Sequence, residues 1–127
     1  MKIVNIQEDT FKHGHANYDG VIIQLDDGTA IQVGISNGQS CCESWGYILS
    51  HDTFDDFIGA TVAECYISDE ALESVDLVEI YEGGMTFFNV NTSKGTLQLV
   101  AYNEHNGYYS HGAVLIKQGE LHLEDYV

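Results

Sequence analysis

Cysteine and histidine side chains in two segments of the chain have the chemistry of a metal site. Cys41 and Cys42 are adjacent in "SNGQSCCESWG", and His105 and His111 bracket "NGYYS". Thiolate and imidazole are the usual ligands of structural zinc, so these four residues are the predicted zinc ligands. Their spacing matches neither a CxxC nor an HExxH pattern. Successive side chains of an extended chain point to opposite faces, so both thiols reach one ion only where the backbone bends.

The loop between the two histidines decides whether their imidazoles share a face. A two-residue turn at Asn106-Gly107 places His105 and His111 on opposite faces of a hairpin. A five-residue loop pairs them instead, with Cβ atoms about 5 Å apart. The alternative for the cysteines is simple packing, because cysteine is among the most buried residue types. A disulfide between Cys41 and Cys42 is disfavoured because its geometry is strained.

Catalysis is disfavoured by the same residues. A thiol nucleophile needs a neighbouring base. Cys41 or Cys42 would be the nucleophile and a histidine the base. No nucleophile motif surrounds them, and no glycine-rich phosphate loop ends in a basic residue. The chain has four lysines and no arginine, so anionic substrates are hard to hold. The prediction is a protein that is not an enzyme, with a small zinc- or thiol-dependent enzyme as the alternative.

Charge is the most pronounced global property. Twenty acidic residues face four lysines, for a net charge of −16. Such a chain repels phosphate and anionic lipid, so neither nucleic acid nor a membrane is an expected partner. A basic protein surface would attract it and speed its capture. The alternative is that the acidity only keeps the protein soluble.

Two acidic segments are the predicted partner-binding residues. They accompany two expected short helices, and for each residue alone the alternative is a solvated surface position or a helix cap. The residues are Asp52, Asp55, Asp56, Asp69, Glu70, Glu73 and Asp76.

Several features indicate the compartment. No apolar run approaches the roughly 20 residues that span a bilayer. The N-terminus turns polar after a few residues, which argues against a signal peptide. Three cysteines, two of them adjacent, do not form a secreted disulfide framework. The expected location is a reducing cytoplasm.

The elements that must position these residues are mostly strands. The 127 residues suit one domain, residues 1–127. Asp26-Asp27-Gly28, Ser93-Lys94-Gly95 and Gln118-Gly119 predict hairpin turns within residues 18–36, 85–103 and 111–127. Residues 61–68 and 75–82 predict further strands.

Two segments predict helices. Residues 51–60 would begin after a Ser50 or Asp52 cap and end at Gly59, with one apolar face formed by Phe54, Phe57 and Ile58. Residues 68–75 would form one or two turns. The predicted fold class is α+β: a mainly antiparallel β-sheet with one or two short helices on one face.

Residues 33–60 and 87–114 together carry a family resemblance. They resemble a family of small proteins from phages and prophages of Gram-positive bacteria, with a Cys-Cys-Glu signature and a later Asn-Gly-Tyr-Tyr-Ser signature. Here these are Cys41 to Glu43 and Asn106 to Ser110. Two signatures that occur together suggest that they meet in space.

The resemblance implies a role against host defence. Some anti-CRISPR proteins of this size block the RNA-guided nuclease of type II systems, whose channel is positively charged. The expected function is therefore an acidic inhibitor in the host cytoplasm that binds such a nuclease and blocks DNA loading. A structural or regulatory phage protein is the other alternative.

Overall fold

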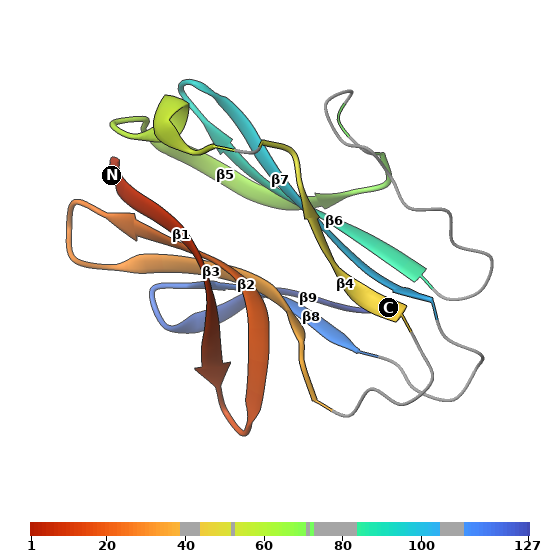
Figure 1. Ribbon diagram of the computed structural model, residues 1–127. Coiled ribbons are helices and arrows are strands. Elements are labelled where there is room, and N and C mark those ends of the chain that lie inside the picture. The colour runs from red at the N-terminus through yellow and green to blue at the C-terminus, as the bar shows by residue number, and fades with distance from the viewer. Residues whose placement is uncertain (39–43, 52, 71, 73–83, 105–110) are drawn as a thin grey trace.

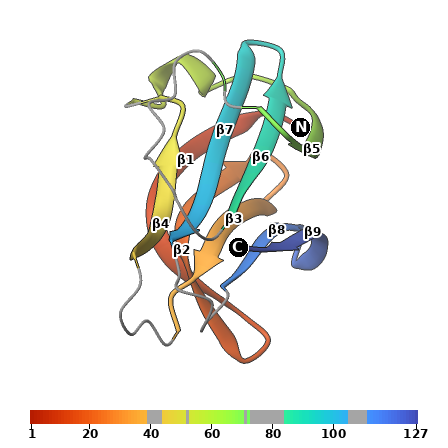
Figure 2. The ribbon, with the colours of Figure 1, turned by 90° about the vertical axis from the view of Figure 1, so that its right-hand side faces the viewer.

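The computed structural model describes residues 1–38, 44–51, 53–70, 72, 84–104 and 111–127. Two antiparallel sheets pack face to face as a β-sandwich, with strand orders β1-β2-β3-β8-β9 and β4-β7-β6-β5 (Figure 1). The strands are β1 (Ile3–His13), β2 (Ala16–Leu25), β3 (Ala30–Ser36), β4 (Ser44–Leu49), β5 (Val62–Ser68), β6 (Gly84–Thr92), β7 (Gly95–Glu104), β8 (Gly112–Lys117) and β9 (Glu120–Tyr126). Figure 2 shows the same two layers after a 90° turn.

The α+β prediction is wrong: the described chain is nearly all antiparallel β. In the described part of residues 51–60, the helical structure is a three-residue 3₁₀ turn, η1 (Asp55–Phe57), between β4 and β5. The side chain of Ser50 does not cap it, because its Oγ accepts the N–H of Gln98 and bonds His51. Phe57 is buried while Ile58 is exposed, so the expected apolar face is incomplete. Gly59 has a φ of +83° after this turn, but the helix that it was expected to end does not form.

The second expected helix is not seen where the chain is described. Ser68 is the last residue of β5, and its hydroxyl donates to the carbonyl of Glu70 instead of capping a helix. Asp69, Glu70 and Leu72 are described and form no helical turn, while residues 71 and 73–75 and the strand expected at 75–82 lie outside the described residues.

The three predicted hairpins are confirmed. Gly28, Gly95 and Gly119 take positive φ in their turns, a conformation that costs glycine little. The registers close on Gln24↔Ala30, Thr92↔Gly95 and Lys117↔Glu120. The strand predicted at 61–68 is confirmed as β5.

The core lies between the inner faces of the two sheets. Ile23, Ile31 and Leu115 from one sheet meet Phe88 and Leu99 from the other, all at most 2% exposed. Every second residue of each strand supplies these side chains, because side chains of a strand alternate between faces. Within the described part, no helix is long and apolar enough to cross a membrane.

The β1–β2 hairpin exchanges its apolar and polar faces along its length. Near its base, Ile6 and Ile23 are paired and face the core. Towards its tip, which projects at the bottom of both views, the same face carries the pair Thr10 and Asp19. The opposite face there carries Phe11, whose ring stacks on its partner Tyr18. This exchange brings carboxylates to the edge of the core.

Candidate functional site

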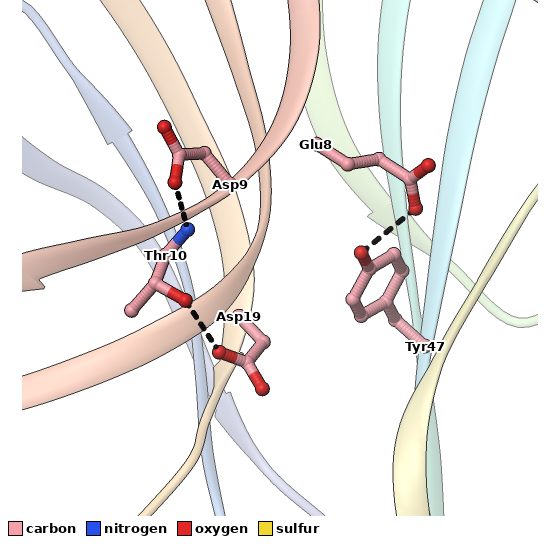
Figure 3. A pocket seen from close by; sticks show the side chains of 5 residues that line it. All are labelled: Glu8, Asp9, Thr10, Asp19 and Tyr47. Atoms are coloured by element: carbon pink, nitrogen blue, oxygen red, sulfur yellow. Dashed lines mark hydrogen bonds between the residues drawn. The ribbon is translucent and has the colours of Figure 1, made fainter.

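A depression of about 350 Å³ lies where the tip of the β1–β2 hairpin passes the edge strand β4 (Figure 3). A second depression of about 270 Å³ adjoins it and shares Glu8 and Tyr47. Three of the five residues lining the first depression are acidic. Its lining is Glu8, Asp9, Thr10, Asp19 and Tyr47.

The two sheets are joined here by one hydrogen bond. The phenol of Tyr47 on β4 donates to Oε1 of Glu8 on β1 at 2.8 Å. Register explains the approach: Glu8 pairs with Val21 on the inner face, and Tyr47 pairs with Ala101, which is also inward. The carboxylate therefore points at the opposing sheet from the border of the core.

The carboxylate of Asp19 on β2 accepts hydrogen bonds from β1 and from the residue that follows β3. Its Oδ1 accepts the hydroxyl of Thr10 at 2.9 Å and the side-chain amide of Asn37 at 2.8 Å. Asp9 is fixed separately: its Oδ1 accepts a hydrogen bond from the N–H of Thr10, and its Oδ2 accepts one from Nε2 of Gln7. These bonds orient the carboxylates while leaving a negatively charged wall. Such a wall can receive ammonium or guanidinium groups.

The surroundings of Tyr47 raise the pKa of its phenol. Burial raises the pKa of its phenol, and the hydrogen bond to Glu8 and the charges of Glu8 and Asp19 raise it further. A raised folded-state pKa means that the folded protein keeps a proton that the unfolded chain loses near pH 10. The stability that the phenol contributes is thus complete below about pH 10 and is lost as pH rises beyond it.

Tyr47→Phe is therefore expected to flatten the alkaline loss of stability. Below about pH 10 the variant should be less stable by about 1 kcal/mol, a value reduced for the partial exposure of the pair. Above that pH the two curves should converge. Urea unfolding between pH 7 and 11 measures this, with Tyr66→Phe on β5 as the matched control. Parallel curves for wild type and Tyr47→Phe would contradict the expectation.

Sequence reasoning did not find this site, because its members are far apart in the chain. Glu8, Asp9 and Asp19 were not among the predicted acidic residues, and Tyr47 was not a predicted site residue. The available signal was Gly14: a turn there with φ of +62° pairs Thr10 with Asp19. Reaching Tyr47 requires knowledge of which strands oppose each other.

The predicted acidic residues fall in separate places. Asp55 and Asp56 are exposed on η1 before β5, and Asp69 and Glu70 are exposed after it. Strand β5 lies between the two pairs along the chain, so the described members form two separate groups. Asp52, Glu73 and Asp76 lie outside the described residues.

The hairpin expected to pair His105 with His111 is wrong. Strand β7 pairs with β4 and β6, and β8 pairs with β3 and β9. Both edges of each strand are occupied in different sheets, so no ladder joins the two. Cys41, Cys42 and His105 themselves lie outside the described residues.

His111 is the predicted zinc ligand that the structure describes. Its ring is 3% exposed and stacks on Trp45 with centroids 5.0 Å apart. Its Nδ1 lies 2.7 Å from the carbonyl oxygen of Ser36, which can only accept, so Nδ1 carries the proton. Metal-bound histidines are commonly oriented by such a bond from the other ring nitrogen. Ser44 pairs with Glu104 nearby, so the ends of β3, β4, β7 and β8 meet here.

Structural zinc at this end of the sandwich stays a prediction, and it has a direct test. Purified protein should contain about one zinc per chain by elemental analysis, and Cys42→Ser should lose the metal. Cys65→Ala is the matched control, because Cys65 is a buried free thiol on β5. A metal-free wild type, or equal zinc in both variants, would refute the site.

Comparison with known proteins gives one match. Residues 1–115 match the model of a domain of unknown function, DUF7448. That span runs from β1 into β8, contains every residue of the depression and omits β9. No curated protein and no solved structure matches the chain. Since the matched residues make up most of its length, the chain belongs to the DUF7448 family.

Proposed function

We propose that this protein is a non-enzymatic inhibitor that binds a basic surface of a partner protein in the host cytoplasm. The partner suggested by the resemblance to phage proteins is the nuclease of a type II CRISPR system, and binding would block DNA loading. The proposal rests mainly on the net charge of −16 and on the walls of oriented carboxylates that the fold presents.

The exposed carboxylates are spread over both sheets and their connections. They occur on β1, in the β2–β3 turn, on η1, on and after β5, and on β9. The ammonium of Lys94 donates to the carbonyl of Ile58 rather than neutralising a carboxylate. A field of one sign over a whole small protein steers a cationic partner from a distance and raises the association rate.

The depression between β1 and β4 supplies a more local feature for this function. Glu8 and Asp19 are fixed by hydrogen bonds before any partner arrives, so little side-chain entropy remains to be lost on binding. An arginine of a nucleic-acid-binding groove matches a carboxylate by paired hydrogen bonds. The same groove must release phosphate to accept this protein, which makes binding competitive with DNA.

A thiol enzyme receives no support from the described cysteine. Cys65 is buried, and burial raises the pKa of its thiol, with a smaller opposing effect from Lys117. A buried protonated thiol is a poor nucleophile. The non-enzymatic proposal is consistent with this chemistry.

Cleavage of target DNA by a purified type II nuclease, with and without the protein, tests the proposal. We expect inhibition that is strong when the protein is added before DNA and weak when it is added after. Affinity should fall steeply between about 50 and 500 mM salt, because exposed charges are screened. The variant Glu8→Gln/Asp19→Asn should weaken binding through faster dissociation.

Two results would count against the proposal. Unchanged cleavage, together with no basic protein retained from host lysate at low salt, would remove the inhibitor function. Binding that is indifferent to salt would remove the electrostatic mechanism even if inhibition were observed.

A further inference from the structure

The outer face of the five-stranded sheet carries a row of residues that crosses all five strands. Phe11 pairs with Tyr18, Tyr18 pairs with Ser36, and Gly112 pairs with Tyr126. Ser36 and Gly112 follow the pair Ile35↔Ala113, which joins the two halves of the row. We call this the aromatic row; its members are Phe11, Tyr18, Ser36, Gly112 and Tyr126.

The inner part of this row is a rigid apolar platform. Phe11 and Tyr18 stack with centroids 5.4 Å apart and pack with Val114 and Ile116, which are buried although they lie on an outer face. The packing is possible because Gly34 has no side chain: a Cβ there would lie 3.0 Å from a ring carbon of Phe11. The platform is thus preformed by the fold.

The outer end of the row is open. Tyr126 is 66% exposed, and Leu121, which pairs with Ile116 on the same face, is 45% exposed. The phenol of Tyr126 donates to Oε1 of Glu124 at 3.4 Å. Gly112 opposite Tyr126 leaves the ring room to lie flat, with 3.8 Å between a ring carbon and the position of a Cβ.

The charges on this face are negative. The next register row begins at Asp9 and ends at Glu124, with Gly20, Gly34 and Val114 between them. Burial, and then the charges of Glu124 and Tyr126, raise the pKa of Tyr18. The four lysines do not occur in either row.

We propose that the open end of the aromatic row, Tyr126 with Glu124, is the docking surface for arginine side chains of the basic partner, while the buried rings of Phe11 and Tyr18 support it from within the sheet. This rests on the proposed function and names the surface and the group that it recognises. A guanidinium stacks on an exposed tyrosine ring and hydrogen-bonds a neighbouring carboxylate, and tyrosine and arginine dominate the energetics of protein interfaces. Tyr126 supplies the ring and Glu124 the carboxylate.

Charge complementarity selects this occupant over the other classes. A second copy of the chain would bring another net charge of −16 and its own Asp9 and Glu124 to the face. A nucleic acid would bring phosphates against the same carboxylates. An arginine-bearing protein surface meets both the rings and the charges.

The test uses two peptide probes, nona-arginine and nona-lysine, with the full-length protein. Amide chemical shifts should change most at Glu124, Asp125 and Tyr126 on β9, and arginine should bind more tightly than lysine, whose ammonium stacks less well. Tyr126→Ala should reduce affinity for nona-arginine about two- to fivefold, the effect of an exposed cation–π contact. Tyr126→Phe should retain the affinity, because it keeps the ring.

Tyr66→Ala is the matched control, because Tyr66 is an exposed tyrosine on the other sheet. The proposal is overturned if Tyr126→Ala and Tyr66→Ala lower nona-arginine affinity equally, or if the shift changes spread evenly over all carboxylates. Loss of the arginine preference in Tyr126→Ala alone supports it.

The two proposals fail in different experiments. If the nuclease or a retained basic host protein binds Tyr126→Ala as tightly as wild type, this surface is wrong while the inhibitor function stands. If no basic protein is bound but Tyr126→Ala alone loses the arginine preference, the surface stands and the proposed inhibitor function fails.

Discussion

Gly20→Ala is expected to lower the free energy of unfolding by about 3 kcal/mol or more, the upper range for forcing extra atoms into packed structure. A Cβ at residue 20 would lie 1.9 Å from the carbonyl oxygen of Val33 and 2.6 Å from Cα of Gly34. Both neighbours are backbone atoms of β3, so no side-chain rotation relieves the contact. The two central strands would have to separate.

The measurement is thermal and urea unfolding of the variant beside Gly112→Ala. A Cβ at residue 112 meets only a ring carbon of Tyr126 at 3.8 Å, an ordinary contact, so this control should stay close to wild type. For a chain of this length, 3 kcal/mol corresponds to a drop in Tm of roughly 10 °C. A Gly20→Ala variant that melts within 2 °C of wild type would show that β2 and β3 do not approach so closely.

Gln98→Ala is expected to cost a similar amount, through hydrogen bonds rather than steric contact. Gln98 is fully buried on the outer face of the four-stranded sheet. Its Nε2 donates to Oδ1 of Asn89 at 2.9 Å and to the carbonyl of Glu70 at 3.0 Å, and its Oε1 accepts the N–H of Leu72 at 3.0 Å. Leaving such groups unpaired costs about 1–3 kcal/mol each, less whatever water restores.

Two readouts separate this cause from a simple cavity. Gln98→Met keeps the volume but makes none of the bonds, so it should be nearly as destabilised as Gln98→Ala. Amide exchange at Leu72 should accelerate at least tenfold in both variants, since its bond to Gln98 is gone. Gln24→Ala, at an exposed position of β2, serves as the control. Full stability of Gln98→Met would mean that packing alone matters here.

The Gln98 variants also bear on the proposed function. The Gln98 side chain holds Glu70 and Leu72 against β7, and Asp69 and Glu70 were among the predicted partner-binding residues. Gln98→Met releases Glu70 and Leu72 but leaves the depression at Glu8 intact. Comparing its partner binding with that of wild type therefore shows which acidic region contributes to binding. If Gln98→Met binds the partner more weakly than wild type, part of the binding affinity belongs to residues 69 and 70.

The zinc prediction stays a prediction, because Cys41, Cys42 and His105 lie outside the described residues. Residues that flank the two signatures lie close together: His111 contacts the carbonyl of Ser36, and Ser44 pairs with Glu104. The expected means, a hairpin between His105 and His111, was wrong because β7 and β8 belong to different sheets. Local spacing cannot show which edges of a strand are already occupied.

Sequence alone determined the three confirmed hairpins and the charge. Each hairpin depends on a glycine with positive φ in a turn of a few residues, and the net charge is the sum of the charged residues. These are local or additive properties, so no knowledge of distant contacts is needed to predict them.

Tertiary structure decided which face of each strand is buried and which carboxylates gather. Along β1 and β2 the buried face changes sides, so Ile6 and Ile23 point into the core while Phe11 and Tyr18 point out of it. Residues 51–60 have helical spacing, yet they do not form the expected helix. Ser50 accepts a hydrogen bond from Gln98 on β7, and Phe57 packs into the core between the sheets. Burial between two sheets outweighs the small preference of a ten-residue segment for helix, because isolated helices of that length are unstable in water.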